Sequence, residues 1–175
     1  MKRLSLALAL ILFIGRTAFA QTRVNPSSQA MRFVQSFYDW YLRQPEGKTD
    51  PWALDTAIKQ RPELFDAPLL KALQIDANAR AHADGEIDGL DFDPFLNSQD
   101  PSTHFKAVSA RGAYVRVIGY EQQISRPREV ISVEVHCTPQ HCVFVNFHYP
   151  AQDGIAAFEL LSILRELHPP KESTP

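Results

Sequence analysis

The sequence lacks the short catalytic motifs that carry a mechanism of their own. It contains no G-x-S-x-G nucleophile elbow, no H-E-x-x-H zinc helix, no glycine-rich phosphate loop and no C-x-x-C pair. The best-marked classes of hydrolase, metalloprotease, nucleotide-binding enzyme and thiol oxidoreductase are therefore not indicated. These absences lower the expectation of catalysis without excluding it, because an active site can also be assembled from residues scattered along a chain.

Long hydrophobic runs are also lacking. The run over residues 4–14 has 11 residues, well short of the roughly 20 that cross a bilayer, so a retained anchor is the weaker alternative. It follows two basic residues and precedes an A-x-A pattern at 18–20, the arrangement of a secretory signal. We expect residues 1–20 to be cleaved and residues 21–175 to form a single domain that is periplasmic or secreted and meets the membrane only during export.

Runs of basic residues are absent after this signal. Cleavage removes three of the 18 Lys and Arg side chains and none of the 20 acidic ones, which leaves a formal net charge of −5. Binding to nucleic acid or to anionic lipid requires clustered positive charge. We therefore expect no nucleic-acid partner, and a small ligand or a cationic protein instead.

Cysteine is scarce, with only Cys137 and Cys142 in the chain. They flank a proline-containing turn between two β-rich runs, which in an exported chain favours a disulfide across a hairpin end. A zinc site that includes His136 and His141 is one alternative, and two free thiols are another. Because neighbouring strand residues point to opposite faces, four ligands converging on one ion would be hard to arrange, so we expect the disulfide and no metal there.

Two hydrophobic periods divide the chain. Apolar residues at helical steps predict helices near 28–42, 53–60 and 66–84, and another that begins at a cap on Asp153 and ends before Pro169. Alternation predicts antiparallel strands over 114–120, 130–137 and 142–149. Helices first and a meander later predict an α+β fold, with N-terminal helices packed on an antiparallel sheet and a C-terminal helix.

The hairpin at 130–149 contains a conflict of register. Direct pairing of the two cysteines would place Asn146 and His148 on the buried face. A slip by one residue would bury Val145 and Phe147 instead, but it would send the two sulfurs to opposite faces. We expect a bulge or irregular turn within 138–141 to satisfy both demands.

The slipped register gathers polar groups on the other face of the sheet. These candidate ligand-binding residues, beside Ser132, are Glu134, His136, Phe144, Asn146 and His148. They form a pocket if the face is concave and covered, and the solvated side of a sheet if it is open. Catalysis by a Glu134 and His148 pair is an alternative use that depends on distances.

The stretch over residues 84–100 holds six carboxylates and no basic side chain. The candidate partner or calcium residues in it are Asp84, Glu86, Asp88, Asp91 and Asp93. Alternating acids before a glycine resemble the opening of a calcium loop, but the position of the closing glutamate is Phe95, so an EF-hand fails. Calcium in another geometry, a basic partner, and plain turn and cap chemistry remain as alternatives.

Three segments together resemble a bacterial exported family. They read FVQSFYDWYL at 33–42, LDFDPFLNSQD at 90–100 and VNFHY at 145–149 before a leucine-rich helix. The combination is similar to the family called domain of unknown function 3828 and covers most of the mature chain. The resemblance implies an α+β fold of the nuclear transport factor 2 or cystatin-like type, with helices on a curved sheet, and it implies no catalytic residue.

From these observations we expect a non-enzymatic exported binding or accessory protein without a resident cofactor. A narrower alternative is an immunity or inhibitor protein against a cationic toxin or wall hydrolase. The other alternative is a small hydrolase or isomerase that uses a pocket on the polar sheet face.

Overall fold

The chain folds as an α+β protein in a computed structural model that describes residues 25–44, 52–83, 88–99, 102–120, 129–151 and 154–169. The predicted signal at 1–20 lies outside these residues. The helices are α1 Pro26–Tyr41, α2 Ala53–Gln60, the 3-10 turn η1 Pro62–Leu64, α3 Ala67–Ala81 and α4 Leu160–Leu167. The strands are β1 His104–Arg111, β2 Tyr114–Tyr120, β3 Glu129–Cys137, β4 Cys142–Tyr149 and β5 Phe158–Glu159.

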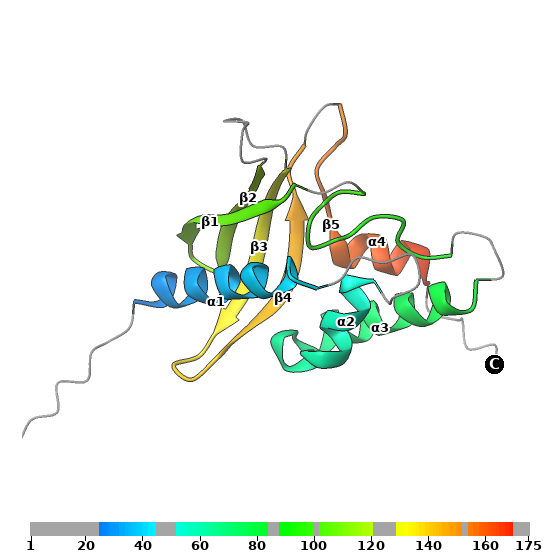
Figure 1. Cartoon of the computed structure of the whole chain (residues 1–175), viewed down its shortest axis with the longest axis horizontal. Helices are drawn as coiled ribbons and strands as arrows, with labels where there is room; N and C mark the ends of the chain where they lie inside the picture. Colours follow the sequence, from blue (N-terminus) through cyan, green and yellow to red (C-terminus); the bar gives the residue numbers. More distant parts are fainter. Residues whose placement is uncertain are drawn as a thin grey trace, which may run out of the picture.

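The five strands form one antiparallel sheet in the order β1-β2-β3-β4-β5. Figure 1 shows α1 lying across one face of this sheet, with α2, α3 and α4 gathered beside β4 and β5. The predicted arrangement of N-terminal helices, antiparallel sheet and C-terminal helix is therefore confirmed. Among the described residues, no helix is both long and apolar enough to span a membrane.

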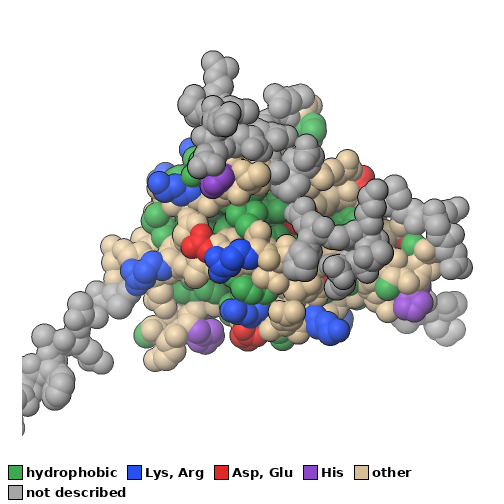
Figure 2. All heavy atoms as spheres, in the orientation of Figure 1, with side chains coloured by type: hydrophobic (Ala, Val, Ile, Leu, Met, Phe, Trp, Pro, Cys, Tyr) green, Lys and Arg blue, Asp and Glu red, His purple; other side chains and the backbone are tan. Residues whose placement is uncertain are grey.

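Positive charge is dispersed over the described surface that Figure 2 shows. Lys and Arg side chains lie singly on this face, separated by uncharged and acidic atoms. This distribution agrees with the lack of basic runs in the sequence, because a surface that binds phosphates concentrates its Lys and Arg in one patch.

Helix α1 begins at an N-cap on Asn25 and buries an aromatic stripe. The Asn25 side chain accepts from the Ser27 backbone N–H at 3.0 Å. The buried residues follow three- and four-residue steps and are Ala30, Val34, Phe37, Tyr38 and Tyr41. On the same helix, the Gln35 amide donates to Phe105 O at 3.2 Å and accepts from Ala107 N at 2.9 Å. The helix thereby covers part of the open edge of β1, which would otherwise present unpaired backbone groups.

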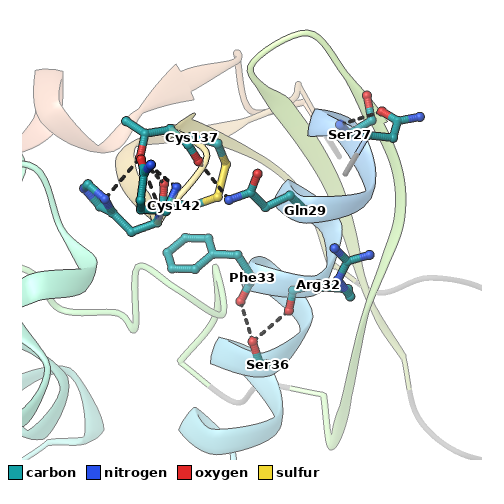
Figure 3. The surroundings of a disulfide bond; sticks show 11 residues. Ser27, Gln29, Arg32, Phe33, Ser36, Cys137 and Cys142 are labelled. Atoms are coloured by element: carbon teal, nitrogen blue, oxygen red, sulfur yellow. Dashed lines mark hydrogen bonds between the residues drawn. A yellow bond between two sulfur atoms is a disulfide. The ribbon is translucent and has the colours of Figure 1, made fainter. Parts of the chain in front are cut away.

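The β3–β4 hairpin carries the predicted disulfide but not the predicted bulge position. Cys137 pairs directly with Cys142, the two sulfurs are bonded, and Gln29 of α1 donates to the Thr138 carbonyl at 2.9 Å beside them (Figure 3). The register shift lies between Glu134 and Val135, so the expected irregularity within 138–141 was wrong.

The extra residue at this shift is Val145, because Asn146 pairs with Glu134 while Phe144 pairs with Val135. The bulge turns Phe144 and Phe147 both toward the helices, where each is fully buried. Val145 is only partly buried, so its predicted place in the core was wrong. One extra residue in the middle of β4 satisfies the cysteine pairing and the polar face together.

Two other expectations from the sequence were also wrong in detail. β1 was not among the predicted strands, and Gly112 sits at φ +60° in the turn that joins it to β2. The last helix does not begin at Asp153: its N-cap is Glu159, and Phe158 belongs to β5. The Asn146 side chain of β4 accepts from the Leu161 backbone N–H at 3.1 Å and so satisfies a free amide of the first turn of α4.

A buried ionic cluster joins α2, α3 and the end of α4. The fully buried carboxylate of Asp76 accepts from Arg80 Nε at 2.9 Å and from the Leu90 backbone N–H at 2.9 Å. His168, which follows α4, places Nε2 3.1 Å from the same carboxylate. Arg80 also donates to Asp55 of α2 at 2.8 Å. The cluster therefore fixes the C-terminal end of α4 against α3.

Gly89 allows the chain to approach this cluster. Its φ is +104°, and a Cβ there would lie 2.6 Å from Asp76 Oδ1 and 2.9 Å from Arg80 Cγ. A side chain at this position would collide with the carboxylate that the Leu90 N–H binds.

Arg80 remains a cation inside the cluster. Burial lowers its pKa, but hydrogen bonds to Asp55 and Asp76 and their negative charges outweigh that effect, so the pKa is raised overall. Its guanidinium also lies over the Trp52 ring at 4.8 Å, a cation–π contact.

Candidate functional site

A groove lies between the end of β4, β5 and α4. The groove is open to solvent, and its volume of about 620 Å³ lies within the range of about 300–1,000 Å³ that is common for small-molecule sites. Its apolar lining residues are Tyr149, Pro150, Ala157, Phe158 and Ile163. Its polar lining residues are Ser132, His148, Glu159, Ser162 and Glu166. A few polar groups above an apolar lining are the usual composition of a ligand site.

His148 lies between two carboxylates. Its Nε2 is 3.1 Å from Glu134 Oε2, and its Nδ1 is 3.4 Å from Glu159 Oε2. The Tyr114 ring meets the imidazole edge to face, with 5.4 Å between ring centroids. Tyr114 is the cross-strand partner of Glu134, and His148 is that of Ser132, so strand pairing positions the cluster.

Glu159 is held by three neighbours. Asn146 Nδ2 donates to Oε2 at 3.1 Å, Ser162 Oγ donates to Oε1 at 2.8 Å, and His148 approaches Oε2. Asn146 is only 5% exposed, and its amide oxygen accepts from the Phe147 and Leu161 backbone N–H groups. The buried amide is therefore satisfied, and it links β4 to the wall of the groove that α4 forms.

The structure brings together three of the five residues predicted for the polar face. Glu134, Asn146 and His148 lie in one hydrogen-bonded cluster. His136 is exposed and pairs with Val143, two positions nearer the disulfide than Glu134. The prediction for Phe144 was wrong, because the bulge turns it into the core.

Sequence reasoning missed the two glutamates on the other side of the groove. Glu159 belongs to a strand of two residues, and Glu166 is an exposed helix residue. Neither the helical nor the strand period of apolar residues therefore distinguishes them. The one available signal was spacing: residues 159, 162, 163 and 166 recur at three- and four-residue steps and so share a helix face.

In the acidic stretch, Asp93 serves a turn. Its Oδ1 accepts from the backbone N–H groups of Phe95 at 2.9 Å and Leu96 at 3.1 Å, and Oδ2 accepts from the Tyr41 hydroxyl at 2.6 Å. Phe95 and Leu96 are buried, so this turn contributes two side chains to the core between α1 and β4. Of the alternatives for this stretch, the role of a turn and cap residue is therefore the one that Asp93 has.

The other candidates of this stretch do not assemble a cation site in the described part of the chain. Asp88 is exposed, and Gln99 reaches Asp91 at 3.4 Å. Asp84 and Glu86 lie outside the described residues. Among the residues that the structure describes, no group of three or more His, Cys, Asp or Glu side chains could hold a metal ion.

Two buried tyrosines hold the same turn. The Tyr38 hydroxyl donates to Phe95 O at 2.8 Å, and the Tyr149 hydroxyl donates to Pro94 O at 2.7 Å. Burial raises the pKa of Tyr38 well above 10.0, and the charge of Asp93 adds to the shift. Burial likewise raises the pKa of Tyr149, with further contributions from Tyr38 and Asp93. Both phenols are therefore held neutral in the folded protein.

Because these two tyrosines are buried and neutral, we expect the protein to lose stability in alkali. Because their pKa values are higher in the folded than in the unfolded state, their contribution to the free energy of unfolding is complete below about pH 10 and is lost above it. Each should reduce the free energy of unfolding by about 1.4 kcal/mol per pH unit above that point. Circular dichroism and phenolate absorbance, followed together, should show that at least two of the five tyrosines ionise only as the fold is lost.

Variants separate this effect from other alkaline damage. Tyr149→Phe should weaken the protein by about 1 kcal/mol at neutral pH, through the lost hydrogen bond, while making its alkaline decline less steep. Ionisation of all five tyrosines before any change in circular dichroism would contradict the prediction.

Comparison of this chain with protein-family models, curated proteins and solved structures finds no match. The resemblance to the exported family therefore stays a prediction, and the groove itself must carry the argument about function.

Proposed function

We propose that this chain is an exported, non-enzymatic binding or accessory protein whose ligand occupies the groove between β4, β5 and α4. The observation that carries the proposal is the groove of about 620 Å³, with polar groups from four elements beside an apolar lining. Its walls are held together by the hydrogen bonds of Asn146 and Glu159, so the site is largely formed before a ligand arrives.

Export is supported by two independent features. The N-terminal 20 residues have the pattern of a cleaved signal. The Cys137–Cys142 disulfide is consistent with an oxidising compartment, because such bonds are rare in reducing ones.

The position of His148 favours binding over catalysis. A general base needs a ring nitrogen within hydrogen-bond reach of the proton that it takes from the substrate. Both nitrogens of His148 already face carboxylate oxygens of Glu134 and Glu159, so substrate would have to displace one of them. A histidine held on both sides suits a fixed element of a binding wall.

Native mass spectrometry of residues 21–175, purified from the periplasm without chelator, tests the proposal. We expect a stoichiometric adduct on the monomer whose mass indicates the ligand class. Ala157 is exposed and lines the groove. Ala157→Trp should therefore abolish the adduct, because the indole would fill the groove. Ala67→Trp is the matched control on an exposed residue of α3 outside the groove. A bare chain, or an adduct that survives Ala157→Trp, would refute the groove as the site.

A further inference from the structure

We infer that the groove selects an organic cation, a protonated amine attached to an apolar body. This inference rests on the proposed function and adds the chemical class of the ligand. Besides Tyr149, whose phenol is held neutral, the ionisable side chains that line the groove are Glu159, Glu166 and His148, and no lysine or arginine of the described chain lines it. Two carboxylates beside one imidazole make the site acidic, which matches a positively charged ligand.

The negative charge of Glu166 is not compensated by any of its described neighbours. It is exposed on α4, and no described cationic side chain lies within ion-pair distance of it. His148, by contrast, already lies within 4 Å of Glu134 and Glu159 and so does not compensate Glu166. A cation entering the groove therefore meets a free carboxylate and no competing positive charge from the described lining.

Glu159 provides a second, oriented acceptor. A carboxylate offers about four acceptor positions; Asn146 and Ser162 use two of those on Glu159, and His148 Nδ1 lies 3.4 Å from Oε2. The side chain is 38% exposed, so one position remains for a donor from the groove. An ammonium group carries three donors and no acceptor, which fits a site that offers carboxylate oxygens.

The apolar side of the groove selects the rest of the ligand. Phe158 and Tyr149 lie against each other with 4.6 Å between ring centroids, and Ile163 faces the same space from α4. An alkyl or aryl group buried here would leave its ammonium near Glu159 and Glu166, where the aromatic rings also favour a cation. A carboxylate or phosphate ligand would meet two like charges without a positive partner.

Three probes with one carbon chain and different head groups test the class: hexylamine, 1-hexanol and hexanoate. Each is titrated at pH 7 and low ionic strength into residues 21–175, and binding is followed by amide chemical shifts. Hexylamine should shift groove resonances saturably, hexanol should bind at least tenfold more weakly, and hexanoate should not bind. Glu166→Gln should weaken hexylamine about fivefold, the effect of one partly screened charge pair. Glu63→Gln removes the same charge from an exposed residue outside the groove and should change nothing.

Other results overturn the inference and can be told apart from failure of the proposed function. Hexanoate binding as tightly as hexylamine, or hexylamine binding that Glu166→Gln leaves unchanged, refutes the cation class. Failure of hexylamine to shift groove resonances refutes it too. In each case the native adduct and its loss in Ala157→Trp decide separately whether the groove binds a ligand of another class.

Discussion

Replacing Asp76 with alanine is expected to destabilise the protein by about 3–5 kcal/mol, because it leaves a buried cation without the more deeply buried of its two carboxylate partners and removes an acceptor from two other segments. Arg80, whose side chain is 12% exposed, would lose its Nε acceptor, and the Leu90 N–H would lose its hydrogen-bond acceptor on α3. His168 would lose the group that anchors the end of α4. Urea unfolding followed by circular dichroism measures the difference in free energy.

Asp55→Asn is the control on the other side of the same guanidinium. Asp55 is 29% exposed and keeps a neutral acceptor as asparagine, so we expect a loss of about 1 kcal/mol or less. Asp76→Ala within 1 kcal/mol of the parent protein would show that the cluster does not hold the three segments together. Loss of α4 anchoring should also broaden the groove resonances of Ser162 and Ile163 in Asp76→Ala.

Replacing Phe144 with alanine is expected to cost about 3–5 kcal/mol, as for other large-to-small changes of a fully buried aromatic residue. Its ring contacts those of Phe33, Phe37, Phe65 and Phe147, at centroid distances of 4.6–5.7 Å. Alanine would leave a cavity at the meeting point of α1, β4 and the segment before α3. Urea unfolding again gives the change in stability.

Comparing Phe144→Ala with a substitution of the neighbouring Val145 tests the strand register. Val145→Ala should cost about 1 kcal/mol or less, because Val145 is the bulged residue and only partly buried. The pairing of Val133 with Phe147, continued along the hairpin without the bulge, would place Val145 in the core and Phe144 on the polar face. A larger loss for Val145→Ala than for Phe144→Ala would therefore contradict the observed pairing.

Local signals predicted the helices best where cap and period coincide. Asp66 accepts from the Leu69 N–H at 2.9 Å as the cap of α3, and Leu69 and Leu73 are buried as expected. The same helix buries Asp76, while Ala81 at its end is exposed. The buried carboxylate depends on Arg80 and on Gly89, which meet it only after the chain has folded.

The candidate site was predictable only in part, for a related reason. Alternation along β3 and β4 places Glu134, Asn146 and His148 on one face whatever the rest of the chain does. Glu159 and Glu166 reach the groove because β5 pairs with β4 and α4 packs beside it, which no local period encodes.

By itself, the sequence determined the caps of α1 and α3, the alternation of the strands and the close spacing of Cys137 and Cys142, because each depends on residues near one another in the chain. Tertiary structure alone decided the bulge at Val145 and the burial of Asp76. The bulge reconciles a disulfide at one end of the hairpin with buried aromatic residues at the other, and a carboxylate can be buried only where distant partners satisfy its charge.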